Sequence, residues 1–527
     1  WPATPSVSAI SWTLIPPCLR RRRSRAPTIR SWEFGLVTTP DPSASTSTMR
    51  ETLGETIESI QQDSAPLPQV TTANLDALRA FALGQKAYGE RLYDDAMGYY
   101  ARATELDPLF ALAWLGQVRV HVAVMQAPKA VAPLRRAQAL RARLPAREAL
   151  YLDAWGARFD VPGTATRKWM TLARLYPDFG PGQSNAAMWL LTDNRFSEAL
   201  AFAKVAAKLP QPDSVIDIDS QGRAYLALDE YAQASRAFDD AVAHGNEGSL
   251  RRKLAVEAAQ RNYDQAAAIE GKLETDDRHA YQERLSLAVD RANWSQAKAL
   301  AAKAGELAKG TGFDSRAFLM PGAVADWLSG DRQSALNSVH KAANGAMSAL
   351  AQEYDADAES DAMLALVSAL LAQRMGDRSL DARVLAAVGK HHAASTPLTR
   401  ELSVVLRAEG ARRDGRPADA ITMLRPLITG HERYQTHVAL WEAYTDAGHS
   451  GPALQQARWL RQHRGIAYSE IKCGICVQAL NVADSNLASL REAEMLKQPG
   501  QATGGGEVIK QPPPAWKDVL RRLPTSG

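Results

Sequence analysis

Residues 77–108 decide the fold, and they read ALRAFALGQKAYGERLYDDAMGYYARATELDP. Two amphipathic helical patterns lie on either side of a break at residues 89–91. In the second pattern a small, an aromatic and a small residue recur at i, i+4 and i+7, namely Ala96, Tyr100 and Ala103. This spacing places the three side chains on one face of a helix, and Pro108 prevents that helix from continuing. The stretch therefore predicts a helical hairpin.

A hairpin this short cannot bury its own apolar faces, so it predicts further hairpins stacked beside it. The pattern Ala-x3-large-x2-Ala or Leu returns after Ala96 at intervals of 34, 35, 34 and 35 residues, beginning at Ala130, Ala165, Ala199 and Ala234. Looser copies begin at Ala266, Ala297, Ala335, Ala382, Ala420 and Ala453. A small residue at the first position lets two helices approach closely, and a large residue one turn later fills the groove between them.

Residues 77–108 resemble a tetratricopeptide repeat, whose period is about 34 residues. The matching positions are Leu83, Gly84, Ala96, Tyr100 and Pro108, and later repeats match at Trp114, Gly222 and Tyr225. The resemblance implies an all-α fold, a right-handed superhelical solenoid of antiparallel helix pairs. An Ala-rich helical chain also produces the looser copies by chance, so the first five repeats support this array more strongly than the later ones.

The composition narrows the function classes. Of the 527 residues, 46% are hydrophobic and 23% are charged, as in ordinary globular proteins. No run of alternating β-branched residues appears, which also favours the all-α class. A formal net charge of +4 is too small for this length to indicate nucleic-acid binding. No run of about 20 apolar residues appears, so no membrane span is expected.

Three cysteines, Cys18, Cys473 and Cys476, cannot form a disulfide framework, so we expect a reducing, cytoplasmic compartment. Cys473 and Cys476 form a lone CxxC, which suits a redox pair or half of a zinc site. No second CxxC or His pair lies nearby in the sequence. The favoured interpretation is therefore two small packing residues on a helix. The chain begins with Trp1 rather than Met, and we expect it to be a fragment.

Breaks in the helical periodicity divide the chain into six segments. We expect a disordered, basic, Pro-, Ser- and Thr-rich extension over residues 1–48, a short helix and linker over 49–76, five well-formed repeats over 77–245, degenerate helix pairs over 246–465, a capping helix over 466–497 and a flexible tail over 498–527. Within that tail, Trp516, Leu520 and Leu523 suit one short docking helix. The basic run at 20–25 suits a nucleic-acid-binding tail, but a disordered extension is the favoured interpretation.

Two segments carry a second resemblance. The first reads LGETIESI at 53–60 and TTANLDALRAF at 71–81, and the second reads RWLRQHRGIAY at 458–468 and LNVAD at 480–484. They resemble the tetratricopeptide arrays of bacterial peptide-modification-system nucleotide cyclases, and related junctions occur in serine/threonine kinases and winged-helix regulators with such arrays. The resemblance covers residues 49–497. It implies that this chain is the non-catalytic half of a signalling protein whose cyclase, kinase or DNA-binding module precedes residue 49.

No motif predicts a catalytic, cofactor-binding or metal-binding residue. The chain contains no GxxxxGK[ST], GxSxG or HExxH sequence. His391 and His392 are adjacent and would point in different directions from a helix, so a polar surface or a turn is favoured. The acidic residues Asp355, Asp357, Glu359 and Asp361 lack the Gly and terminal Glu of a calcium loop, so we expect a solvated charged face.

The remaining candidate is a binding surface. In tetratricopeptide arrays the first helix of each pair lines a concave groove, and the corresponding positions here are Phe81, Gln85, Tyr88, Leu115, Arg119, Val122, Ala154, Ser184, Met188, Asp219 and Arg223. This mixture of apolar and polar side chains suits an extended or helical peptide of a protein partner. It lacks the Lys, Asn and Arg set of a clamp for a chaperone's C-terminal carboxylate. For each position plain packing between helices is the alternative, and for Leu115 and Val122 packing is favoured.

Overall fold

The computed structural model describes residues 72–124, 126–160, 162–209, 214–310, 313–352, 358–392, 396–497 and 510–523. These residues form helices and contain no strand, so the all-α expectation is confirmed. They separate into two compact units, one ending at Asp153 and the other beginning at Ala154. The basic run at 20–25 and the expected helix near residue 53 lie outside the described residues.

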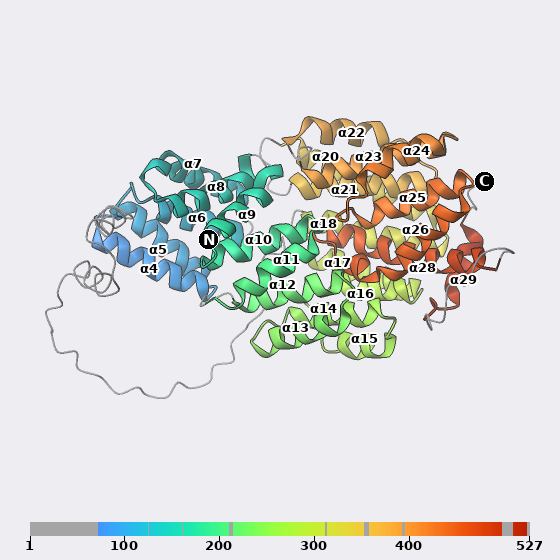
Figure 1. Ribbon diagram of the computed structural model, residues 1–527, viewed down its shortest axis with the longest axis horizontal. Coiled ribbons are helices and arrows are strands. Elements are labelled where there is room, and N and C mark those ends of the chain that lie inside the picture. Colours follow the sequence, from blue (N-terminus) through green and yellow to red (C-terminus); the bar gives the residue numbers. More distant parts are fainter. Residues whose placement is uncertain are drawn as a thin grey trace, which may run out of the picture. The chain divides into compact units, whose positions relative to one another are not determined.

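The first unit contains two helix pairs (Figure 1). Its elements are α4 (Leu75–Gly89), α5 (Tyr93–Leu106), α6 (Ala111–Ala123), α7 (Ala127–Ala139), the short η1 (Arg141–Arg143) and the start of α8 (Ala146–Asp160). The predicted hairpin is confirmed by α4 and α5, which pack against each other, while α5 also packs against α6. The side chain of Asn74 caps α4 by accepting from the backbone N–H of Asp76 and Ala77.

Tyr100 shows why the repeat needs glycine on its first helices. The Tyr100 side chain is fully buried between α4 and α6. A Cβ atom built at Gly84 would lie 2.7 Å from the Tyr100 ring, and one at Gly116 would lie 2.6 Å from it. The same contact recurs in the second unit, where a Cβ at Gly222 would lie 2.4 Å from the Phe238 ring. Small residues therefore set the distance between helices, and the aromatic ring fills the space.

The second unit continues as a series of helix pairs. Its elements up to residue 462 are η2 (Pro162–Thr164), α9 (Ala165–Leu175), α10 (Gly180–Thr192), α11 (Phe196–Ala206), α12 (Ser214–Ala227), α13 (Tyr231–Ala243), α14 (Ser249–Ala259), α15 (Tyr263–Glu270), α16 (Ala280–Asp290), α17 (Trp294–Leu307), α18 (Phe313–Ala317), α19 (Leu319–Ser329), α20 (Arg332–Leu350), α21 (Ala358–Arg374), α22 (Asp381–Lys390), α23 (Pro397–Arg413), α24 (Pro417–Leu424), η4 (Arg425–Leu427), α25 (Tyr434–Asp446) and α26 (Ser450–Gln462).

A left-handed residue marks the turn inside most pairs, in both units. The non-glycine examples are Arg91, Asn194, Asp229, Arg261 and Ala292, with φ between 55° and 61°. Later turns use glycine instead, at Gly330, Gly376, Gly415 and Gly448. Because one backbone conformation recurs at each of these turns, the helix pairs are copies of one unit.

The alanines of the repeat pattern are buried, with one exception. Ala96, Ala130, Ala165, Ala234, Ala266, Ala297, Ala335 and Ala420 are fully buried, and Ala199 and Ala453 are 1% exposed. The pattern starting at Ala382 is wrong, because Ala382 is exposed. On α22 the buried residues are Val384 and Val388, which follow the buried Leu380, so large side chains face the core there.

The C-terminal part of the second unit folds back onto the array. It contains α27 (Arg464–Ser469), α28 (Gly474–Met495) and α29 (Ala515–Arg522). The sequence predicts that residues 466–497 cap the end of the array. Instead, α28 runs along it and contacts α16, α19, α21 and α25 as well as α26 and α27 (Figure 1). The first four are the first helices of their pairs, and we call the surface that they turn towards α28 the inner face. Most of α28 is buried around its whole circumference, including polar residues such as Asn481 and Asp484.

The expected docking helix at the C-terminal end is present as α29. Trp516 is fully buried there, and its Nε1 donates to the backbone oxygen of Asp290 over 2.8 Å. The Trp516 ring also packs edge-on against Trp294, with ring centroids 5.3 Å apart. In the part of the chain that the structure describes, no helix combines the length and apolar character that a membrane crossing requires.

Candidate functional site

Three of the predicted groove residues meet on α4 and α6 in the first unit. Nη1 of Arg119 donates to Oε1 of Gln85 over 2.7 Å, and the Arg119 guanidinium carbon lies 4.1 Å from the centroid of the Tyr88 ring. The same Gln85 oxygen accepts from the buried Tyr100 hydroxyl over 2.5 Å. Burial raises the pKa of Tyr100 to about 12, so this hydroxyl keeps its proton. We call Gln85, Tyr88 and Arg119 the α4–α6 face.

The other three candidates in the first unit belong to packing. Leu115 is 2% exposed and Val122 is 7% exposed, so both lie in the core. The half-buried Phe81 packs its ring against Tyr100 and Phe110, with centroid distances of 5.7 and 4.9 Å. These residues hold α4, α5 and α6 together and offer little surface to a ligand.

Three candidates in the second unit also serve packing. Ala154 is fully buried, and Met188 is 5% exposed within an apolar cluster. The Ser184 hydroxyl donates to the carbonyl of Gly180 one turn earlier in α10, over 3.1 Å. The remaining two candidates, Asp219 and Arg223 on α12, have a different environment because they are charged and buried.

Asp219 and Arg223 begin a series of buried ion pairs. The Asp219 carboxylate accepts from Nε of Arg223 on its own helix and from Nη1 of Arg252 on α14, both over 3.0 Å. It also accepts from the Ser249 hydroxyl over 2.6 Å. A buried carboxylate with three donors is fully compensated, so Asp219 joins α12 to α14.

The series of buried ion pairs continues towards α16 and α18. Arg251 on α14 pairs with Glu283 on α16 over 2.6 Å, and Arg278 pairs with Asp314 on α18 over 2.7 Å. Each pair joins residues 32 or 36 positions apart, which is about one repeat. The inner face of this unit therefore carries ordered charges instead of a plain apolar lining.

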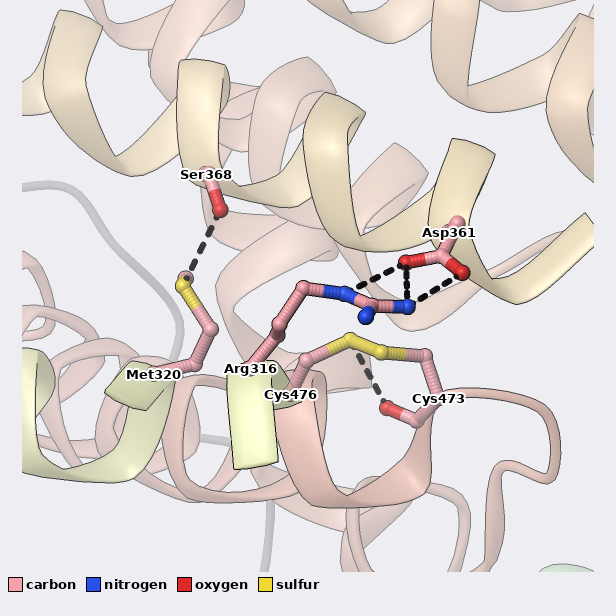
Figure 2. The surroundings of a disulfide bond; sticks show 6 residues. All are labelled: Arg316, Met320, Asp361, Ser368, Cys473 and Cys476. Carbon is pink, nitrogen blue, oxygen red and sulfur yellow. Dashed lines mark hydrogen bonds and ion pairs between the residues drawn. A yellow bond between two sulfur atoms is a disulfide. The ribbon is translucent and has the colours of Figure 1, made fainter. Parts of the chain in front are cut away.

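The expectation of a solvated acidic face is wrong for Glu359 and Asp361. Asp361 is fully buried and accepts three hydrogen bonds from the Arg316 guanidinium, two from Nη2 over 2.6 and 2.7 Å and one from Nε over 3.1 Å (Figure 2). Glu359 forms an ion pair with Lys472, and its side chain is 15% exposed. Burial acts against the charge on Glu359, but Lys472 lowers its pKa below the usual range. Asp355 and Asp357 lie outside the described residues.

Cys473 and Cys476 are joined by a disulfide bond at the start of α28, beside Arg316 and Asp361 (Figure 2). The interpretation as two unbonded packing residues is therefore wrong, although both are buried, at 3% and 2% exposure.

One pocket lies in the second unit where α12, α14, α16 and α18 face the segment that enters α28. It is partly open to solvent, and about 740 Å³ of unfilled space lies between its walls when the open part is counted. Its lining includes charged groups, Arg223, Arg251, Arg252, Glu283, Asp314 and Lys472, and apolar ones, Leu226, Ala255, Ile471 and Ile475. We call this space the α28 entry pocket. Only Arg223 among its residues was predicted.

Sequence reasoning missed the other polar residues of the α28 entry pocket for a specific reason. The adjacent pair Arg251 and Arg252 lies on α14, where a surface helix would also place arginines. The available signal was their position on a first helix, about one repeat after Asp219 and Arg223. The segment 468–475 comes from more than 200 residues away, and no periodicity in α14 indicates its arrival.

No group of three or more His, Cys, Asp or Glu residues is arranged to hold a metal within the described ranges. His391 and His392 follow the end of α22 with their ring centroids 4.0 Å apart. They lie beside a stretch whose placement is not described, at residues 393–395.

Comparisons with known proteins identify distant structural likeness only. No protein family model matches the chain, and no curated protein matches its sequence. Among solved structures, the P58(IPK) TPR domain is 14% identical, with 81% of this chain and 100% of that chain covered and a TM-score of 0.24. Human IFIT1 in a dimer with PPP-AAAA is 12% identical, covering 72% and 88%, with a TM-score of 0.37. Yeast Tom70 is 13% identical, covering 80% and 97%, with a TM-score of 0.30. Because these scores are low, the assignment of an all-α array of helix pairs rests on the chain's own turns, glycines and pairings.

Proposed function

We propose that this chain is a non-catalytic protein-interaction module that binds a peptide segment of a partner on the α4–α6 face. The observation that carries the proposal is the arrangement of Gln85, Tyr88 and Arg119. They place an amide, an aromatic ring and a guanidinium side by side on two first helices. Aromatic rings and arginine contribute strongly to polypeptide recognition, because they combine apolar area with directed hydrogen bonds.

The second unit supports the proposed binding of a peptide segment, because its first helices already hold a helical segment of the same chain. Its first helices α16, α19, α21 and α25 hold α28, a helix of the same chain, along their inner face. This surface therefore buries a helical segment, which is the way that an amphipathic helix fits a groove. In the first unit we propose that the equivalent surface receives a segment from another protein.

A peptide-display experiment tests the proposal. The purified 527-residue chain is used to select binders from a random peptide library, and the selected peptides are then measured against the Tyr88→Ala/Arg119→Ala double variant. We expect at least about tenfold weaker binding, which corresponds to about 1.4 kcal/mol. Arg102→Ala is the matched control, because the exposed Arg102 pairs only locally with Glu105 on α5. Equal binding by a folded double variant would exclude the α4–α6 face.

A wider role as the regulatory half of a bacterial signalling protein in the cytoplasm rests on the resemblance of residues 49–497 to cyclase-associated arrays. In this proposal a catalytic or DNA-binding module on the same polypeptide responds when the array binds its partner. The purified chain should then turn over neither ATP nor GTP. Turnover that survives further purification and disappears with a point substitution in this chain would show that the chain is itself an enzyme.

A further inference from the structure

Four buried polar atoms in the α28 entry pocket have no hydrogen-bond partner among the described residues. They are Nη2 of Arg252, Nε2 of His279, Oε2 of Glu283 and Oδ1 of Asp314. All four residues line the pocket, and none is more than 9% exposed. Buried polar groups in folded proteins nearly always have partners, because leaving one unsatisfied costs about 1–3 kcal/mol. Four such atoms around one cavity therefore indicate a polar ligand.

The second polar atom of each charged group is already engaged and fixes its orientation. Nη1 of Arg252 donates to Asp219 over 3.0 Å. Oε1 of Glu283 accepts from Arg251 over 2.6 Å, and Oδ2 of Asp314 accepts from Arg278 over 2.7 Å. Each group is thus held by an ion pair on one side, and its other polar atom lies without a partner within the wall of the pocket. Such preorganisation is what a specific small-molecule site requires.

The charges in the pocket differ from wall to wall. The α12 and α14 wall carries the guanidinium groups of Arg223, Arg251 and Arg252, whereas α16 and α18 contribute the carboxylates of Glu283 and Asp314. The segment that enters α28 adds one group of each sign, Glu470 and Lys472. A simple anion would be repelled by the carboxylates, and a simple cation would be repelled by the guanidinium groups. A ligand with one group of each charge satisfies both walls.

The neutral residues of the pocket define the rest of the ligand. Leu226, Ala255, Ile471 and Ile475 supply an apolar wall. His279 is neutral near pH 7, because burial together with Arg278, Arg251 and Arg252 lowers its pKa well below the usual value. A neutral imidazole contributes one hydrogen bond without adding charge.

We propose that the α28 entry pocket binds a free aliphatic α-amino acid as its zwitterion. The ligand carboxylate accepts from Arg252 and Arg223, and its ammonium group donates to Glu283 and Asp314. Its side chain packs on Leu226 and the two isoleucines. A peptide end offers only one of the two charges beside its first or last side chain, so the free amino acid fits better than a peptide terminus. The site lies within the second unit and does not depend on the interaction function proposed for the first.

The test measures binding to the full chain by ligand-observed NMR and by thermal unfolding. Aliphatic L-amino acids at about 10 mM are compared with their N-acetyl and amide analogues, which each lack one charge. We expect at least one of leucine, isoleucine and valine to bind and to raise the unfolding temperature, with both analogues at least tenfold weaker. An analogue that binds as well as the amino acid would indicate a peptide terminus instead and would overturn the proposal. Absence of binding by all three amino acids would also overturn it.

Two substitutions locate the site. Glu283→Gln keeps the side-chain oxygen that pairs with Arg251 but loses the charge, and Asp314→Asn does the same opposite Arg278. Each should weaken amino-acid binding at least tenfold while peptide binding on the α4–α6 face stays unchanged. Asp518→Asn is the matched control, since the exposed Asp518 pairs with Arg521 on α29. Binding that is unchanged in both variants would place the ligand elsewhere and reject the site.

Discussion

The guanidinium of Arg464 lies 2.6 Å from the carboxylate of Asp290, although 174 positions separate the two residues in the chain. Asp290 is fully buried at the end of α16 and also accepts from the hydroxyl of Tyr468 and the amide of Asn486, both over 2.8 Å. Its backbone oxygen accepts from Trp516. Helices α16, α27 and α28 therefore meet at the Asp290 carboxylate, and α29 joins the same residue through its backbone oxygen.

Replacing Asp290 by Ala should destabilise the second unit by about 3–5 kcal/mol. The substitution leaves the Arg464 guanidinium buried without its counter-charge, which is the costly way to break a buried pair. Chemical denaturation followed by circular dichroism measures the change. Asp518→Ala removes an exposed ion pair and should leave the denaturation midpoint unchanged. Equal midpoints for both variants would contradict the role of Asp290.

Gly84→Ala and Gly116→Ala should each destabilise the first unit by about 1–3 kcal/mol, because the added Cβ would lie within 2.7 Å of the Tyr100 ring. Gly98→Ala provides the control on α5, where an added Cβ meets nothing within 4 Å. That change should stabilise by about 0.5–1 kcal/mol, since alanine favours a helix interior over glycine. Thermal unfolding tests whether the first two variants have a lower unfolding temperature than the parent and the third a higher one.

Ala96→Leu should cost about 1–3 kcal/mol by overpacking the fully buried contact between α4 and α5. Neighbouring pairs stabilise one another in a repeat array, so fraying should spread from this pair. Hydrogen exchange should show faster exchange in α4 and α5 before later helices are affected. Ala82→Leu places the same side chain at an exposed position of α4 and should leave the protection pattern as it is.

Glu401 should make stability fall as the pH rises towards neutrality. Burial raises its pKa to about 7, despite the nearby Arg433, so the folded chain holds a proton that the unfolded chain releases near its ordinary value of 4.5. The stabilisation is complete below about pH 4.5 and is lost as the pH rises through about 7.

The Glu401→Gln variant removes this titration. Its stability relative to the parent should increase between pH 5 and pH 7 by up to about 1.4 kcal/mol per pH unit and then stay level. Urea denaturation at several pH values measures the difference, and other titrating groups cancel because both proteins contain them. A difference that is independent of pH would show that Glu401 is ionised in the folded chain.

Local periodicity was enough to predict the helix pairs, because the information lies within about 30 residues. Ala96, Tyr100 and Pro108 mark one pair, and the buried alanines of most later pairs follow the same spacing. The exception at Ala382 shows the limit of this reasoning. The valines of α22 face the core there, and a pattern search that asks for alanine selects the wrong face.

The residues of a candidate site could be predicted from the sequence only where they lie on two consecutive repeats. Gln85 and Arg119 occupy related positions 34 residues apart, and the structure brings them into contact. The α28 entry pocket depends on residues from distant segments, such as Arg252 on α14 and Lys472 just before α28. The polar residues of α28 resemble those of a solvated helix face in the sequence, because some of their partners, such as Gln435 and Asp290, lie more than 40 residues away.

The return of α28 to the inner face also determines when the second unit can finish folding. Helices α16 and α19 leave the ribosome well before residues 474–495 are synthesised, and until then their inner surfaces lack the partner that covers them. A simple repeat array can grow one hairpin at a time and tolerate truncation. Here α28 is needed to cover the inner face. A nascent chain that stops near residue 460 should therefore expose this surface and become a substrate for chaperones.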